Sequence, residues 1–161
     1  MSNPVLVGLG QPELCEVQAV LERAIDRLEG IGWTQHKFWS LGDNGAPKGF
    51  CALGAIGGYL LWSERPSFDY AERVAGSLLA GMVYNLMVSD PLGDYDNWYE
   101  WAVKAIGHWN DSSLTRKADV IAKLNEAIQI VKDEIVLRLV DSAPCSVEFN
   151  DVIEIKENEY A

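Results

Sequence analysis

The sequence is poor in cysteine and histidine, and this shortage argues against two kinds of site. Its three cysteines, Cys15, Cys51 and Cys145, are odd in number and widely spaced, which is not the pattern of a disulfide framework. We therefore expect buried free thiols in a reducing, cytoplasmic location. Neither a Cys-x-x-Cys nor a His-x-x-x-His spacing occurs, and the two histidines lie far apart, so we predict no metal site.

The sequence also lacks a long apolar run and a phosphate-binding loop. The longest apolar stretch, residues 50–62, contains several glycines and is too short to cross a bilayer. The N-terminus has no basic segment followed by an apolar one, so we expect no signal peptide. Gly54, Gly57 and Gly58 are not followed by the lysine and hydroxyl residue of a nucleotide-binding loop, and we predict no cofactor.

Basic residues are scarce as well. The 13 lysines and arginines stand against 24 aspartates and glutamates, which gives a formal net charge of -11 and a pI of about 4.5. This charge repels nucleic acids and anionic membranes, so we predict neither as a direct partner. It favours a partner protein with a basic surface, although solubility alone is the commoner reason for an acidic composition.

What the sequence does contain is a series of helical periodicities. Its 161 residues fit one domain, in which apolar residues recur at helical spacing. We predict a mainly α fold, a single helical domain over residues 1–145. The expected helices cover about 12–29, 51–62, 67–88, 96–107 and 115–140. The acidic residues 146–161 follow as a short C-terminal strand or an extended tail.

Local signals refine these boundaries. Ser67 and Thr115 are placed to cap the third and fifth helices, and residues 109–113 are expected to form a loop. The turn-rich run 41–49 predicts a hairpin with short flanks. The charged residues of the first helix, among them Arg23 and Arg27, are assigned to its polar face. The helix that begins at residue 51 is expected to be the buried centre, because its glycines allow another backbone to approach closely.

Three short clusters stand at predicted helix boundaries. They are Gly32-Trp33-Thr34-Gln35, then Cys51-Ala52-Leu53-Gly54-Ala55, then Trp109-Asn110-Asp111 with Thr115. The motifs Gly-Trp-x-Gln, Cys-Ala-x-Gly-Ala and Trp-Asn-Asp, in this order, resemble those of a family of small uncharacterised bacterial and phage proteins, over about residues 17–131. The resemblance implies an accessory protein, located in the host cytoplasm if a phage encodes it, and it brings no known activity or site residue.

One hypothesis from these clusters is enzymatic. A thiol at the start of a helix is stabilised as a thiolate by the helix dipole, so Cys51 is a candidate nucleophile for a cysteine-dependent hydrolase or transferase. In that reaction His108 would be the base and Asp111 would orient it. The other interpretation, which we favour, is a small buried thiol that packs among alanines and glycines.

The preferred hypothesis is binding without catalysis, by an accessory protein that engages a host or bacterial protein, for example as an inhibitor or anti-defence protein, or a small ligand. A ligand site would be lined by Trp33, Gln35, Trp109 and Asn110, although core packing and turn hydrogen bonds explain the same residues. Self-association stays open. The candidate partner contacts are acidic or aromatic and lie in two segments: Asp90, Asp94, Tyr95, Asp96 and Trp98, then Glu148, Asp151 and Glu154.

Overall fold

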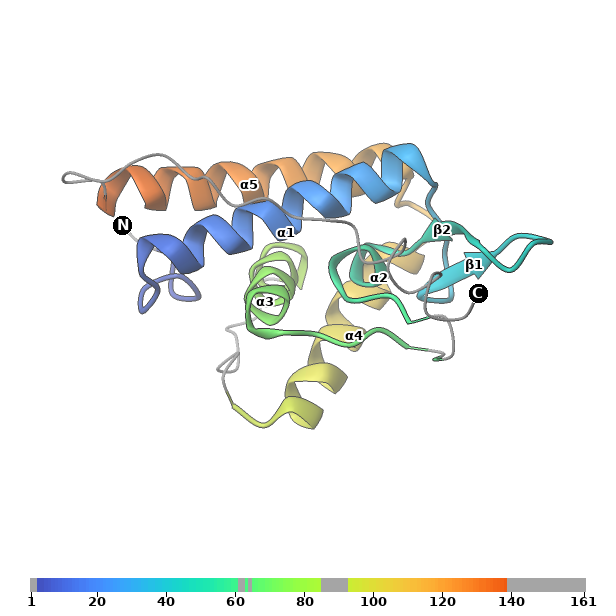
Figure 1. The fold of residues 1–161 in the computed structure, drawn as a ribbon, viewed down its shortest axis with the longest axis horizontal. Helices are drawn as coiled ribbons and strands as arrows, with labels where there is room; N and C mark the ends of the chain where they lie inside the picture. The colour runs from blue at the N-terminus through green and yellow to red at the C-terminus, as the bar shows by residue number, and fades with distance from the viewer. Residues whose placement is uncertain (1–2, 61–62, 64, 85–92, 139–161) are drawn as a thin grey trace.

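The computed structural model describes residues 3–60, 63, 65–84 and 93–138, and over these ranges the protein is a mainly α domain with a small hairpin (Figure 1). The elements in chain order are α1 (Gln11–Gly30), β1 (Trp39–Leu41), β2 (Pro47–Phe50), α2 (Ala52–Ile56), α3 (Tyr70–Tyr84), α4 (Tyr95–Asp111) and α5 (Lys117–Arg138). The predicted fold class is confirmed. The predicted C-terminal strand or tail lies outside the described residues.

The two longest helices, α1 and α5, run side by side and form one layer of the molecule (Figure 1). The helices α2, α3 and α4 lie on the other side of α1 (Figure 1). Each helix buries its apolar stripe against a neighbour, so apolar side chains at helical spacing fill the core between the two layers. The fully or nearly fully buried apolar residues of α1 and α5 are Leu14, Val17, Val20, Leu21, Ala24, Leu28, Val120, Leu124, Ala127 and Val131.

The predicted hairpin is confirmed. Strands β1 and β2 pair antiparallel, with Trp39 opposite Phe50. Its turn contains Gly45 at a φ of 79°, a conformation that favours glycine. The side-chain oxygen of Asn44 accepts a hydrogen bond from the N–H of Ala46 at 3.0 Å, which is the turn chemistry expected of asparagine. The hairpin leads directly into the start of α2, so it positions the second motif.

Helix α2 is shorter than predicted: the expectation of a helix as far as residue 62 is wrong for residues 57–60, and residues 61 and 62 lie outside the described ranges. The chain turns extended at Gly57, with a ψ of 174°. The next residue pairs with a returning segment, because the N–H of Gly58 donates to the carbonyl of Ser67 at 2.7 Å. A Cβ at Gly57 would lie 2.7 Å from the Cβ of Pro66. Close packing of this returning segment therefore replaces helix continuation.

Three helix boundaries also differ from the predicted ones. Helix α3 is capped by Asp69 and not by Ser67, because the Asp69 carboxylate accepts from the N–H of Glu72 at 2.8 Å and Glu72 returns a bond of 2.8 Å to the N–H of Asp69. Helix α4 extends into the segment 109–113, which was expected to be a loop, and ends at Asp111. Helix α5 begins at Lys117, and the hydroxyl of Thr115 instead donates to the carbonyl of Trp109 at 2.6 Å.

Two further expectations concern cysteines and membranes. Cys15 is disulfide-bonded, so the expectation of free thiols is wrong for this residue, whereas Cys51 is free and buried. Sequence spacing misled here because it does not determine how close two thiols come in a fold. The inference of a reducing compartment therefore loses its basis. Among the helices of the described ranges, none has the length and apolar character needed to cross a membrane.

Candidate functional site

The three sequence clusters meet at the side chain of Asn110, which is fully buried near the end of α4. Its amide oxygen accepts a hydrogen bond from the indole Nε1 of Trp33 at 2.9 Å and one from the N–H of Ala52 at 3.0 Å. Its amide nitrogen donates to the carbonyl of Thr34 at 3.1 Å and to a carboxylate oxygen of Asp111 at 3.0 Å. One side chain therefore joins α4, the segment after α1, and the start of α2.

This bonding uses the full capacity of the asparagine amide, which has two donor hydrogens and an oxygen with two lone pairs. A buried amide with all its partners stabilises one arrangement of the surrounding backbone, because any shift would leave a polar group unsatisfied. The amide of Asn110 and the indole N–H of Trp33 are thus engaged within the fold. We call this set of bonds the Asn110 centre.

Gln35 and His36 extend the centre towards the surface. The Gln35 amide nitrogen donates to the carbonyls of Asn110 at 2.9 Å and Ser112 at 3.1 Å. The backbone N–H of His36 donates to the Asp111 carboxylate at 2.8 Å. His36 adopts a φ of 69°, the only positive φ of a non-glycine residue in the described ranges. The cost of this strained backbone is offset by the bonds of Gln35 and of the His36 N–H itself.

Two glycines of the motifs are required by close backbone contacts. Gly32 has a φ of 145°, and a Cβ there would collide with the carbonyl oxygen of Lys48. A Cβ on Gly54 would collide with the carbonyl of Phe38, at the entrance to the hairpin. Any larger residue at either position would push these segments apart. The glycines therefore let the clusters approach closely enough to reach Asn110.

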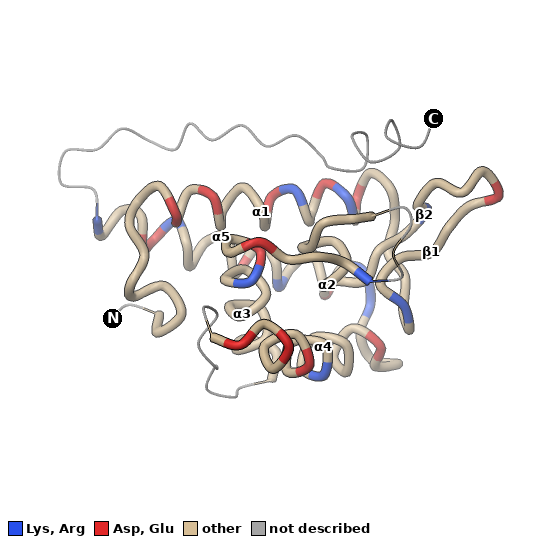
Figure 2. Tube along the Cα trace, turned by 60° about the horizontal axis from the view of Figure 1, so that its bottom comes forward, with Lys and Arg blue, Asp and Glu red and all other residues tan. Residues whose placement is uncertain are grey.

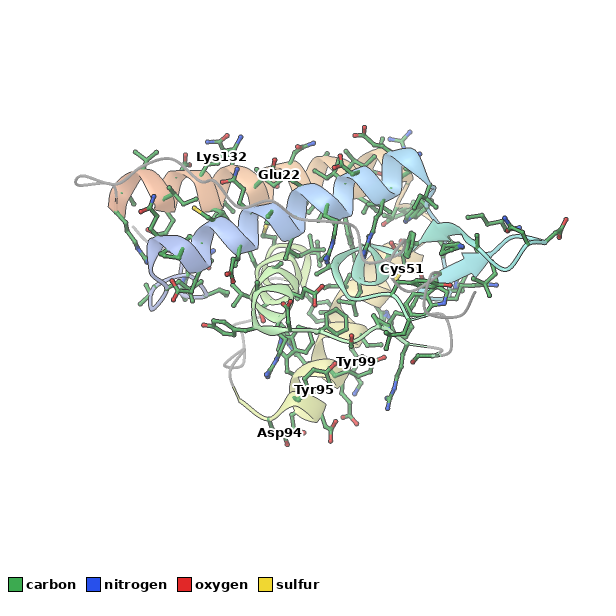
Figure 3. The ribbon with its side chains drawn as sticks, viewed as in Figure 1. Glu22, Cys51, Asp94, Tyr95, Tyr99 and Lys132 are labelled. Carbon is green, nitrogen blue, oxygen red and sulfur yellow. The ribbon has the colours of Figure 1, made fainter. Side chains whose placement is uncertain are left out.

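Cys51 is the N-cap residue of α2, and its sulfur accepts a hydrogen bond from the N–H of Gly54 at 3.3 Å. Burial raises the pKa of the Cys51 thiol from 9.0 to about 12, against the lowering effect of the Gly54 hydrogen bond. The thiol is therefore protonated at neutral pH. A catalytic cysteine needs the opposite shift, towards the thiolate. Figure 3 shows Cys51 in the interior of the molecule.

The proposed catalytic partners of Cys51 do not form a relay with it among the described interactions. His108 lies on the exposed face of α4. Asp111 bonds to the backbone of His36 and lies 3.8 Å from the His36 ring nitrogen Nδ1. This geometry gives Cys51 a capping role and does not support the enzymatic hypothesis. Within the described ranges, no three histidine, cysteine or carboxylate side chains gather as metal ligands.

Two buried arginines of α1 hold the C-terminal end of α2, and the sequence interpretation that put them on the polar face is wrong. Arg27 donates to the carbonyls of Ala55 at 3.0 Å and Gly57 at 2.7 Å. Arg23 donates to the carbonyl of Ile56 and pairs with Glu72 at 2.7 Å. Burial raises the pKa of Glu72 despite the opposing effect of Arg23. The signal was available, because these arginines are four residues apart and adjoin apolar residues of the same face.

The predicted partner-contact segment is only partly at the surface. Asp94, Tyr95 and Asp96 are exposed at the beginning of α4, and Asp94 caps the helix by accepting from the N–H of Asp96 at 3.0 Å. Trp98 is 1% exposed and its indole donates to the hydroxyl of Ser77 at 2.8 Å, so it is a core residue and not a contact residue. The remaining candidates, Asp90, Glu148, Asp151 and Glu154, lie outside the described residues.

Tyr95 and Tyr99 form a stacked aromatic pair one helical turn apart, with ring centroids 6.2 Å apart and ring planes at 19° (Figure 3). Arginines cover both rings: the guanidinium of Arg73 lies 5.3 Å from the Tyr95 centroid and that of Arg65 lies 5.4 Å from the Tyr99 centroid. Burial raises the pKa of both tyrosines. Sequence reasoning missed Tyr99, although its spacing from Tyr95 places both on one helix face.

The fold and the Asn110 centre define a small helical domain whose three motifs serve to join its segments. Residues 13–130 match a family of unknown function, DUF6197, and the protein belongs to that family. The match includes all three motifs, from Gly32 to Thr115. No curated protein and no solved structure matches the chain.

Proposed function

We propose that the protein is a non-enzymatic binding protein, an accessory factor of bacterial or phage origin that engages a partner protein through the start of α4. The observation that carries the proposal is the stacked pair of Tyr95 and Tyr99 beside exposed acidic residues. Tyrosine is enriched in interface hot spots because it offers a large contact area with little rotamer entropy to lose. A role as an inhibitor or anti-defence protein would use such a contact.

Charge supports a basic surface on the partner. Asp94, Asp96 and Glu100 are all exposed on the first turns of α4, and Figure 2 shows the acidic positions gathered at that end of the helix. The whole chain carries a formal charge of -11. Complementary charge speeds the encounter of two proteins, and this attraction weakens as the salt concentration rises. The partner is therefore expected to bind faster and more tightly at low ionic strength.

The other two hypotheses have less support. Trp33, Gln35 and Asn110 use their side-chain donors in the Asn110 centre, so a small ligand would have to compete with bonds of the fold. Trp109, the fourth predicted ligand residue, is half-buried and packs against the core. The nucleophile hypothesis has little support because the Cys51 thiol is buried and protonated at neutral pH. A partner face on α4 requires no rearrangement of these groups.

The test places a photo-crosslinking amino acid at position 95 of the full chain, with the same amino acid at the exposed position 126 of α5 as the control. A protein that is captured from bacterial extract at position 95 alone is then purified, and its Kd is measured at low and high salt. Because asparagine preserves the helix cap, the double variant Asp94→Asn, Asp96→Asn removes charge without removing the cap. It should raise the Kd about fivefold or more, whereas Glu126→Gln should not.

Two results would contradict the proposal. The first is the absence of any product specific to position 95 in extracts of several bacterial hosts. The second is a captured protein whose Kd responds neither to salt nor to the Asp94 and Asp96 variant, since such a contact would not depend on the face described here.

A further inference from the structure

The outer face of α4 carries a charge pattern that the proposed function does not use. Asp96, Glu100, Lys104 and His108 are all exposed and follow one another at four-residue intervals. Successive residues at this spacing are neighbours on the helix surface, so the four form one inclined ridge along the outer face of α4. The first two are acidic and the last two are basic, so this row changes sign about halfway along the helix.

None of these four side chains has an ion-pair partner in the described part of the chain. Between the charges lie Val103, which is half-buried, and Gly107, where an added Cβ would meet nothing within 4 Å. The residues between the charges are therefore small or partly apolar. They present no steric obstacle to a second helix that packs along this row of charges.

The positions of the charges are symmetric about one point. The midpoint between Glu100 and Lys104 is the level of Ala102, and the midpoint between Asp96 and His108 is the same level. An antiparallel copy of α4, related by a two-fold axis at that level, places every acidic residue opposite a basic one. Two-fold interfaces are self-complementary in this manner, because each contact occurs twice.

We propose that this face of α4 binds the same face of a second copy of the chain, in an antiparallel, two-fold dimer. Glu100 of each copy pairs with Lys104 of the other, and Asp96 pairs with His108. Leu114, in the loop that follows α4, is 86% exposed and offers apolar area at each end of the interface.

The loop that carries Leu114 is held in place before any contact forms. The hydroxyl of Ser112 accepts from the N–H of Leu114 at 3.2 Å, and the carbonyl of Ser112 accepts from the Gln35 amide. Pre-ordered contact residues lose less entropy on binding. One helix face and two such ends form a small interface, which predicts a weak dimer whose population depends on protein concentration.

This inference does not depend on the unidentified partner of the proposed function. It does have a consequence for that partner, because Asp96 and Glu100 belong to both surfaces. Dimerisation and binding of a basic partner exclude one another. The dimer would then cover the acidic residues that bind the partner, and dissociation of the dimer on dilution or at high salt would expose them.

The experiment is sedimentation equilibrium of the full chain over a range of concentrations, at low and high salt. Glu100→Lys places two lysines opposite each other, and Lys104→Glu places two glutamates opposite each other, so each single variant should raise the dimer Kd about fivefold or more. The double variant Glu100→Lys, Lys104→Glu restores opposite charges and should recover the wild-type Kd. Glu126→Lys on α5 makes the same change in net charge as Glu100→Lys and should leave the Kd unchanged.

A mixture of the two single variants gives the sharpest result. Each alone repels its own copy, but one copy of each brings lysines opposite glutamates at both pairs, so the mixture should form a heterodimer. A wild-type chain that stays monomeric at every concentration would overturn the proposal. So would a dimer that the single variants leave unchanged, or a mixture that behaves as the sum of its parts. Circular dichroism of each variant establishes that the helices are intact.

Discussion

Trp33 and Asn110, 77 positions apart in the sequence, are joined by a hydrogen bond of 2.9 Å from the indole Nε1 to the side-chain oxygen. The same oxygen accepts from the N–H of Ala52, so the bond connects all three motifs of the chain. Because every hydrogen-bonding position of the asparagine amide is used, this residue has no isosteric substitute with the same pattern of donors and acceptors. The motifs are thereby explained as parts of one structural centre.

The first prediction is that Asn110→Asp lowers the free energy of unfolding by about 3 kcal/mol, although the two side chains have the same shape. An aspartate has no amide hydrogens, so its second oxygen would face the carbonyl of Thr34 and the carboxylate of Asp111, both of which are acceptors. Urea denaturation measures the loss. The control is Asn97→Asp on the exposed face of α4, and an equal loss in that variant would show that the centre is not special.

The second prediction concerns two glycines whose replacement by alanine should have opposite effects. Gly54→Ala forces a methyl group onto the carbonyl of Phe38 and should destabilise the protein by at least about 2 kcal/mol. Gly107→Ala adds a methyl group to open space within α4 and should stabilise it by about 0.5–1 kcal/mol. Thermal melts of both variants at low protein concentration test this pair. Similar changes in Tm for the two would contradict the described packing.

The sequence predicted the elements whose signals are local. The periodicity of apolar residues located α1 within one or two residues, and the Asp43-Asn44-Gly45 turn indicated the hairpin. Boundaries set by distant segments were missed. Helix α2 ends at Ile56 because the returning segment at Pro66 packs against Gly57, and no local feature of residues 51–62 indicates that contact.

The same division applies to the candidate site. The sequence identified the motif residues but not that they bond to one another, because hydrogen bonds across 58 to 77 positions depend on the fold. Charge was a misleading guide for Arg23 and Arg27, which are buried because the carbonyls at the end of α2 need donors. Trp98 was placed at a partner surface on residue type alone, although its position on the helix faces the core.

The third prediction tests the role of Arg27. Arg27→Met keeps a long side chain but removes the bonds to the carbonyls of Ala55 and Gly57. Two buried acceptors then lose a charged donor, and the free energy of unfolding should fall by about 3 kcal/mol. Arg116→Met, at a side chain that is 81% exposed, is the matched control and should change stability by less than about 0.5 kcal/mol. Equal effects would refute the capping role.

The fourth prediction separates capping from catalysis at Cys51. A thiol with a pKa of about 12 carries almost no thiolate at neutral pH. Iodoacetamide should therefore modify Cys51 at pH 7.5 at least about a hundredfold more slowly in the native protein than in urea, where the pKa is ordinary. Mass spectrometry of the modified peptide follows the reaction. Rapid alkylation of the native protein would instead support the nucleophile hypothesis.

The fifth prediction follows from the same pKa. The folded thiol loses its proton near pH 12, whereas the unfolded thiol loses it near its ordinary value of 9.0. Above pH 9 the unfolded state therefore binds fewer protons than the folded state, and stability must fall as the pH rises from 9 towards 12. Below pH 9 both states are protonated, and the contribution of the thiol is fully present. The loss approaches about 1.4 kcal/mol for each pH unit in this window.

Other groups also titrate at alkaline pH, among them Tyr95 and Tyr99, whose pKa values are raised by burial. The measurement is therefore a difference between two urea-denaturation profiles, of the wild type and of Cys51→Ser. Serine is a good N-cap residue, so its hydroxyl can replace the sulfur as acceptor for the N–H of Gly54 without titrating in this range. The wild type should lose stability above pH 9 faster than the variant does. If the two profiles stay parallel up to pH 11, the thiol is not buried as described, and its assignment as an inert cap fails with it.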